Sequence, residues 1–157
     1  MRGFGFAEHG GLDRLEFVDI PEPLPGPGEV RVRVRASAFN RLDRFTLEGI
    51  PGVEVVRPHV LGSDGAGVVE RVGDGVDSLA AGERVLLNPG LWDGVCDACR
   101  GGQEALCRNY RILGEHVQGT VTRYVSCRAA TSIDSPHGSR SRKGPPRPWS
   151  LRPPGAR

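Results

Sequence analysis

Three cysteines and one aspartate lie close together in one short segment, and their types and spacing suit a metal ion. Cys96 and Cys99 form a C-x2-C pair, Cys107 follows after seven more residues, and Asp93 precedes Cys96 by three positions. Structural zinc takes about four such ligands in a tetrahedron, with zinc–sulfur distances of about 2.3 Å. A C-x2-C turn directs two thiolates at one ion, and the later cysteine closes the shell. We therefore predict a structural zinc site made by Asp93, Cys96, Cys99 and Cys107.

These three cysteines have alternatives to zinc binding. They can be inert, they can form a disulfide with one thiol left over, or they can be a redox pair. The N-terminal residues M-R-G-F-G-F-A-E-H lack the apolar run of a signal peptide, and no apolar stretch approaches the roughly 18 residues of a membrane span. We therefore expect a cytoplasmic protein without membrane contact, and reducing conditions favour metal or redox ligands over disulfides. A redox pair would begin a helix after a strand, whereas this segment is rich in Gly and Asp. Cys127 lies in another context and is left out of the site.

Length and composition favour one small domain. The 157 residues include 23 Gly and 13 Pro, which favour turns and short strands over long helices. Phe, Trp and Tyr together number only nine, so we expect a core of Val, Leu, Ala and Ile. The net charge of +2 is unevenly distributed: residues 128–157 hold seven basic residues and one acid, and residues 1–127 hold 14 basic and 18 acidic residues.

The sequence up to residue 126 reads mainly as β-structure. Residues 31–36 (R-V-R-V-R-A) alternate with period two, which predicts a strand with Val30, Val32, Val34 and Ala36 on one face. Further short strands are expected in G-A-G-V-V-E-R-V-G and in A-G-E-R-V-L-L-N-P. Residues 40–49 are the best candidate for a short helix. Strands this short and this regularly interrupted by turns predict a small barrel or sandwich.

Taken together, these segments resemble the N-terminal, GroES-like domain of the zinc-type medium-chain alcohol dehydrogenases. The similarity rests on V-R-V-R-V-R-A-S-A-F-N-R-L-D, P-H-V-L-G-S-D-G-A-G-V-V-E-R-V-G-D-G-V, A-G-E-R-V-L-L-N-P-G, C-D-A-C with E-A-L-C, and I-L-G-E-H-V-Q-G-T-V-T-R-Y-V, in that order. The resemblance implies a mainly β, GroES-like barrel over residues 1–126, with a structural-zinc lobe over residues 88–110. It also implies NAD(P)-dependent oxidation or reduction of a small alcohol, carbonyl or enone substrate, and a homo-oligomer for the full-length protein.

The chain departs from this family where a catalytic zinc would bind. Family members with that ion have a cysteine at the position of Asn40 and a His-Glu pair at Ser63-Asp64. An amide and a hydroxyl are poor zinc ligands, so we expect no catalytic zinc. The combination is similar to zinc-independent quinone and enone reductases, which implies that Asn40, Ser63 and Asp64 mark the substrate side and that Asp43 supports the same turn. Alternatively, Asn40 only caps the short helix.

In the metal lobe, Asp93 stands where the family has its first cysteine. Asp93 can ligate zinc, it can face solvent and leave the fourth position to water, or the site can be empty. Two histidines beside these motifs, His59 and His116, are expected to be hydrogen-bonded structural residues. The glycines of residues 62–67 do not follow the dinucleotide-binding order, and we expect them to allow close backbone packing.

No G-x-G-x-x-G occurs in the sequence. The family's Rossmann domain, which holds NAD(P), is therefore not recognised, and we expect the chain alone to be inactive. Residues 127–157 are rich in Arg and Pro and are expected to form a disordered tail, with a frameshift before Cys127 as one explanation. Alternatively, the basic tail is genuine and the chain is a zinc-stabilised binding module for nucleic acid or an acidic partner, although it lacks interleaved aromatic residues. A co-chaperonin subunit is disfavoured by the cysteine lobe.

Overall fold

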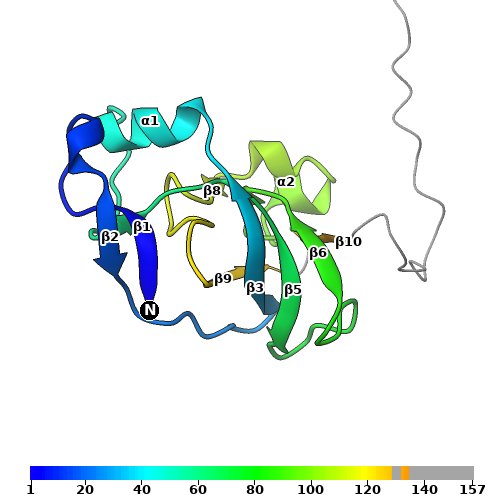
Figure 1. Cartoon of the computed structure of the whole chain (residues 1–157). Coiled ribbons are helices and arrows are strands. Elements are labelled where there is room, and N and C mark those ends of the chain that lie inside the picture. The colour runs from blue at the N-terminus through cyan, green and yellow to red at the C-terminus, as the bar shows by residue number, and fades with distance from the viewer. Residues whose placement is uncertain (129–131, 135–157) are drawn as a thin grey trace, which may run out of the picture.

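The computed structural model describes residues 1–128 and 132–134, and within them β-strands predominate (Figure 1). The mainly β fold expected from the sequence is therefore confirmed. The strands are β1 (Arg2–Phe6), β2 (Glu16–Asp19), β3 (Glu29–Ala38), β4 (His59–Val60), β5 (Asp64–Val72), β6 (Arg84–Leu87), β7 (Gly90–Leu91), β8 (Arg111–Ile112), β9 (Tyr124–Arg128) and β10 (Ser132–Asp134). The helices are α1 (Arg41–Glu48), α2 (Asp97–Arg100) and two 3-10 turns at Leu12–Arg14 and Glu104–Leu106.

A five-stranded antiparallel sheet forms the centre of the fold. Its strand order is β10-β6-β5-β3-β9, so the long strands β3 and β5 lie side by side in the middle. A second sheet has the order β2-β1-β4, and β7 pairs with β8 in a small third sheet. The figure shows β3, β5 and β6 running together, with α1 and α2 at the same end of these strands (Figure 1).

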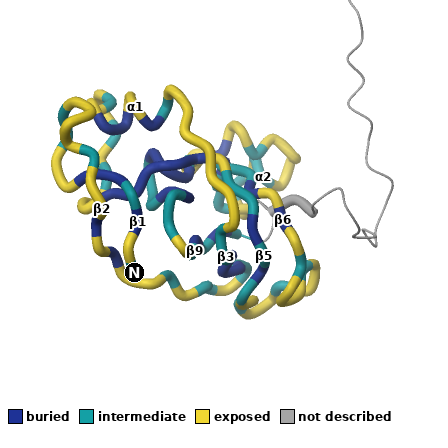
Figure 2. The backbone as a smooth tube through the Cα atoms, in the orientation of Figure 1, coloured by how far each residue is buried: buried dark blue, intermediate teal, exposed yellow. Residues whose placement is uncertain are grey.

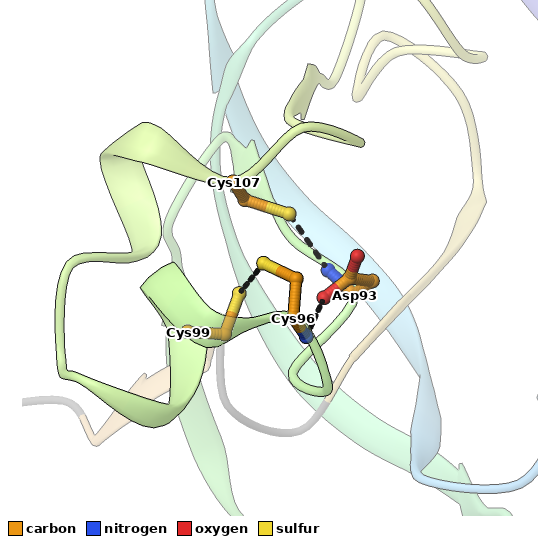
Figure 3. A group of neighbouring side chains, drawn as sticks. All are labelled: Asp93, Cys96, Cys99 and Cys107. Carbon is orange, nitrogen blue, oxygen red and sulfur yellow. Dashed lines mark hydrogen bonds between the residues drawn. The ribbon is translucent and has the colours of Figure 1, made fainter.

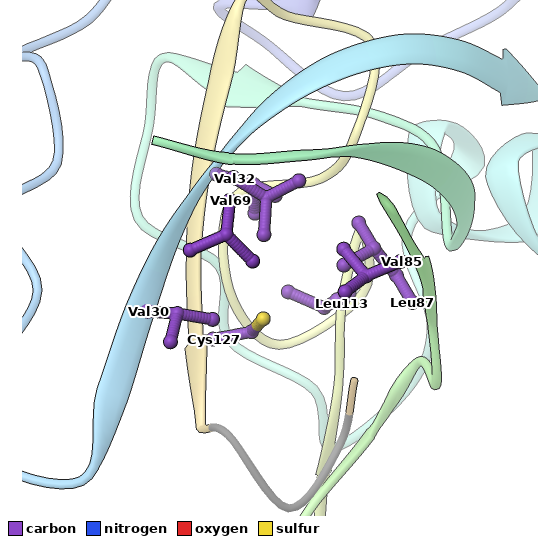
Figure 4. Packing of buried hydrophobic residues seen from close by; sticks show 8 residues of the cluster. Val30, Val32, Val69, Val85, Leu87, Leu113 and Cys127 are labelled. Carbon is purple, nitrogen blue, oxygen red and sulfur yellow. The ribbon is translucent and has the colours of Figure 1, made fainter. Parts of the chain in front are cut away.

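Valine and leucine build the core beneath the central sheet, as the shortage of aromatic residues predicts. The buried cluster takes its side chains from four strands and one loop (Figure 4), and Figure 2 marks the buried stretches of the backbone in dark blue. Its members are Val30, Val32, Val69, Val85, Leu87, Leu113, Val125 and Cys127. Cys127 is thus a core residue and takes no part in the metal cluster.

The alternation along β3 holds for only part of its length. Val30 and Val32 are fully buried and Val34 is half-buried, as predicted, but Ala36 is exposed. From Arg35 to Ala38 all four residues are exposed, so neither face of the strand is buried there, and the pairing with β9 ends at Arg33. On the opposite face, Arg31 is only 6% exposed because its guanidinium donates to Glu70 at 2.6 Å.

The strands β1 and β2 near the N-terminus were not predicted. In β1, the sequence R-G-F-G-F alternates, but its glycines lower the intrinsic preference for a strand. Gly5 nevertheless suits its place, because a Cβ there would lie within 2.9 Å of the Val60 Cα on the paired strand β4. Glycine therefore lets β1 and β4 approach closely.

The close-packing role expected for the glycines of residues 62–67 is confirmed at two positions. A Cβ on Gly67 would lie 2.6 Å from the side chain of Val32 on the neighbouring strand β3. Gly62 has φ of +98°, and a Cβ there would lie 2.6 Å from the Thr120 hydroxyl. Both a positive φ and this lack of space require glycine at position 62.

His59 is completely buried and fills a structural position, in agreement with the sequence-based expectation. Its Nε2 lies 3.2 Å from the Gly114 carbonyl oxygen and donates to it, and its ring lies 5.5 Å from that of Phe6. Burial holds the pKa of His59 below its ordinary value of 6.5.

This pKa shift predicts loss of stability in mild acid. Below pH of about 6.5 the unfolded chain binds a proton at His59 that the folded chain does not bind, so the unfolding free energy falls as the pH drops through that range. We expect urea unfolding to show this slope and His59→Gln to flatten it between pH 7 and 5. An unchanged slope in the variant would assign the effect to other groups.

Within the described residues, no helix combines the length and the apolar character that a membrane crossing requires. The C-terminal tail expected over residues 127–157 falls outside the described residues, apart from 127–128 in β9 and 132–134 in β10. The pairing of β10 with β6 brings residues 132–134 into the central sheet.

Candidate functional site

The four residues predicted to bind zinc come together in the structure (Figure 3). The ligand atoms of Asp93, Cys96, Cys99 and Cys107 all lie within 4.8 Å of one another. The Cys96 and Cys99 sulfurs are 3.5 Å apart, close to the edge of about 3.8 Å of a tetrahedron with zinc–sulfur bonds of about 2.3 Å. Cys96, Cys99 and Cys107 form no disulfide, and 3.5 Å is far longer than a disulfide bond. The donor set therefore fits a zinc ion.

Short elements place these ligands. Asp93 follows β7, Cys96 is the N-cap of the one-turn helix α2, Cys99 lies within that helix, and Cys107 ends the second 3-10 turn. Pairing of β7 with β8 closes the base of the lobe, with Gly90 opposite Ile112. The expectation that this C-x2-C pair does not begin a helix therefore needs a correction: a short helix begins at Cys96, because the C-x2-C turn continues for one helical turn up to Gly101.

The lobe has no hydrophobic core of its own. Between Leu91 and Tyr110, Cys107 is the only buried residue, and Val95 and Leu106 are more than 60% exposed. A segment with so little buried apolar surface has little to offset its conformational entropy. A bound metal would connect the turns of the lobe through its ligands and so stabilise the lobe.

Hydrogen bonds prepare the Asp93 carboxylate for a cation. Its Oδ1 accepts the backbone N–H groups of Val95 and Cys96 at 2.9 and 3.0 Å, and its Oδ2 accepts from the Asn109 side chain at 2.9 Å. The two backbone donors in particular hold the pKa of Asp93 well below its usual range. Asp93 is therefore ionised, as a metal ligand must be.

The thiols differ in their surroundings. A backbone N–H from Cys99 lowers the pKa of Cys96, whereas burial, followed by the bond to Cys96, raises the pKa of Cys99 to about 12. The Cys107 sulfur accepts backbone N–H groups from Asp93 and Asn109, both at 3.4 Å. Backbone groups therefore hold the Cys107 sulfur in place within the cluster.

The residues expected on the substrate side lie at the junction of α1 and β5. Asn40 is the N-cap of α1: its Oδ1 accepts the Leu42 N–H at 2.8 Å, so the capping role left open by the sequence is real. Its Nδ2 donates to Asp64 Oδ2 at 3.3 Å. Capping occupies the amide oxygen alone, so the amide nitrogen stays available for another role.

Asp43 joins this helix to the loop before β5. One carboxylate oxygen accepts the Asn40 N–H at 2.6 Å and the other accepts the buried Gly62 N–H at 2.6 Å. The side chain is almost fully buried. Asp43 thus fixes the distance between Asn40 and the Gly62–Asp64 turn.

Ser63 and Asp64 face different surroundings. Asp64 is exposed beside Asn40, whereas Ser63 is 3% exposed, and its hydroxyl has no hydrogen-bond partner among the described residues. Thr120, which the sequence did not point to, donates its hydroxyl to the Asp64 carbonyl oxygen at 2.7 Å and steadies this turn.

An apolar pocket of about 200 Å³ adjoins the same junction. Small-molecule sites typically combine such a hollow with a few polar groups at its edge. Asn40 and Asp43 lie at its edge, and the remaining lining residues are Phe4, Leu12, Leu15, Phe39, Arg44, Leu47 and Leu61.

Comparisons with known proteins agree with this architecture. The sequence family described as "Alcohol dehydrogenase GroES-like domain" matches residues 26–137. L-idonate 5-dehydrogenase of Vitis vinifera is 45% identical over 60 residues, which are 38% of this chain and 16% of that protein. An NAD-dependent alcohol dehydrogenase of Sulfurisphaera tokodaii is 33% identical over 132 residues, which are 80% of this chain and 38% of that protein.

Solved structures give the same result. A crystal structure of an NAD-dependent alcohol dehydrogenase is 44% identical, superposes with a TM-score of 0.82, and covers 90% of this chain and 41% of its own. A cobalt- and zinc-bound thermostable alcohol dehydrogenase from Pyrobaculum aerophilum is 33% identical, with a TM-score of 0.77 and coverage of 87% and 41%. The chain therefore spans less than half the length of these relatives.

Proposed function

The chain belongs to the family of alcohol dehydrogenase GroES-like domains, and from this premise we propose that it forms the substrate side of an NAD(P)-dependent oxidoreductase. The substrate class is a small alcohol or carbonyl compound, or an activated enone. The observation that carries the proposal is the hydrogen-bonded unit of Asn40, Asp43 and Asp64, which presents an exposed amide beside an apolar pocket.

Asn40 would bind the substrate oxygen. An amide nitrogen carries two N–H donors, and the bond to Asp64 uses one of them. The other can donate to a carbonyl or hydroxyl oxygen, and the pocket offers apolar surface for the rest of the substrate. Asp43 would hold the amide in place through the backbone of Asn40. Asp64 would orient the amide from the other side.

We assign the two metal sites of the family differently. The donor set of Asp93, Cys96, Cys99 and Cys107 fits a structural zinc. At the substrate side, Asn40 and Ser63 offer only an amide and a hydroxyl, which zinc rarely takes as ligands. In this proposal, hydrogen bonds and not a zinc ion activate the substrate. The chain would then resemble the quinone and enone reductase branch of the family.

The hydride would come from a nicotinamide cofactor, which is the chemistry that such a group supplies when bound. The described residues do not fit this cofactor. Within residues 1–128 and 132–134, no strand leads through a glycine-rich turn into a helix that could hold its phosphates.

A chimera tests this proposal. Residues 1–126 would replace the matching part of the NAD-dependent alcohol dehydrogenase with which the chain shares 44% identity. We expect NAD(P)H consumption with an enone or aldehyde and one zinc per chain. Asn40→Ser, which preserves the helix cap but removes the amide N–H groups, should lower kcat/KM about tenfold, the worth of roughly one hydrogen bond.

The triple change Asn40→Cys, Ser63→His and Asp64→Glu restores the family's zinc ligands and is the matched comparison. It should add a second zinc and make turnover sensitive to chelators. A second zinc in the unchanged chimera, or full activity in the Asn40→Ser variant, would contradict the assignment.

A further inference from the structure

The carboxylate in the metal lobe has one more ligand atom than the thiolate of the family pattern. A cysteine presents a single sulfur, whereas Asp93 presents two oxygens that rotate together about one bond. The backbone N–H groups of Val95 and Cys96 hold only Oδ1. These two donors leave Oδ2 without a backbone hydrogen bond, so a donor to Oδ2 adds a second restraint on rotation of the carboxylate.

Asn109 supplies that donor. Its side-chain amide donates to Asp93 Oδ2 at 2.9 Å, although the two residues are 16 positions apart. Its backbone N–H also donates to the Cys107 sulfur at 3.4 Å. Asn109 thus contacts two of the four ligand side chains from outside the cluster.

Such outer contacts matter for metal sites. Partners that orient a ligand change metal affinity by about 10–100-fold when they are removed. With Oδ1 held by two backbone donors and Oδ2 held by the amide, the carboxylate cannot turn away from the three sulfurs.

We propose that Asn109 is a positioning residue that makes Asp93 an effective zinc ligand. This inference deepens the zinc site described under the proposed function and rests on it. The side-chain amide is the part that acts, because the backbone contact to Cys107 remains whatever side chain follows.

The first measurement is the zinc dissociation constant of the full chain by competition with a chromophoric chelator. Asn109→Ala should bind zinc about tenfold more weakly, at the low end of the usual range because the hydrogen bond is exposed. Gln103→Ala is the matched control, since it removes an exposed amide from the same lobe and should leave the affinity unchanged. The visible absorption of the cobalt-substituted protein should also change in Asn109→Ala, because one ligand is reoriented, and not in Gln103→Ala.

The decisive measurement repeats the Asn109→Ala change in an Asp93→Cys background, where Oδ2 no longer exists. The loss should shrink there to less than about twofold. An equal loss in both backgrounds would show a general structural role for Asn109, and no loss in the wild-type background would show no role; either result overturns the inference. If neither the wild type nor Asp93→Cys binds zinc, the assignment of the zinc site is wrong. That result is distinct from one in which zinc binds but Asn109 has no effect.

Discussion

Replacing Cys107 by serine is expected to abolish tight zinc binding. The change leaves a hydroxyl, a poor zinc ligand, in place of the only buried sulfur of the cluster. Two thiolates and one carboxylate would remain, and we expect binding at least about 100-fold weaker. The metal content after gel filtration should drop from one zinc per chain to nearly none.

The same variant should show how far the metal stabilises the domain. Zinc that binds only the folded lobe adds about 4 kcal/mol at a free concentration of about 1,000 times its dissociation constant. Adding a chelator should therefore lower the thermal midpoint of the wild type by many degrees and leave that of Cys107→Ser unchanged. Cys127→Ala is the matched control, because it removes a core cysteine and should keep the zinc and the response to chelator. If a chelator left the thermal midpoint of the wild type unchanged, the result would show that the metal does not stabilise the lobe.

The metal cluster was predictable because its signal is local. Asp93, Cys96 and Cys99 lie within seven residues, so spacing alone limits where their side chains can meet. Cys107 is close enough in sequence to close the same loop. Asn109 lies near them in sequence too, but an asparagine has many local uses and nothing in its spacing identifies a hydrogen bond to Asp93.

Parts of the fold followed from pattern and other parts did not. The alternation of β3 and the helix after Asn40 were predicted because each depends on neighbouring residues. The exposure of Ala36 was not, since both faces of β3 are exposed from Arg35 onward, beyond its pairing with β9, and the sequence of β3 alone does not show where that pairing ends. The strand β1 was missed because its glycines serve close contact with β4, a tertiary reason that outweighs a weak local preference.

On the substrate side, too, the sequence did not predict the tertiary contacts. The sequence placed Asn40, Ser63 and Asp64 together through resemblance to a family, and the structure brings Asn40 and Asp64 into contact. Their roles in binding a substrate stay predictions. The hydrogen bond between Asp43 and Gly62 links positions 19 residues apart, and no periodicity in the sequence predicts it.

This bond leads to a large expected effect on stability that does not depend on the metal. Asp43→Ala removes the acceptor of two backbone N–H groups, those of Asn40 and Gly62, and it breaks the capping box of α1. A buried donor left without a partner costs about 1–3 kcal/mol, and loss of a cap interaction costs about 1 kcal/mol. We expect the unfolding free energy to fall by about 3 kcal/mol, a large share of the 5–15 kcal/mol typical of a domain.

Urea unfolding of three variants would separate the reasons for this loss. Asp43→Asn keeps the shape but has only one acceptor oxygen, so it should recover less than half of the lost stability. Asn40→Ala removes the side-chain bond to Leu42 and should cost only about 1 kcal/mol. Asp13→Ala, at an acid whose side chain is 81% exposed, should change stability by less than about 0.5 kcal/mol. If Asp43→Ala matched Asp13→Ala, the link between α1 and the Gly62 turn would contribute nothing to the fold, and the positioning of Asn40 for a substrate would need another cause.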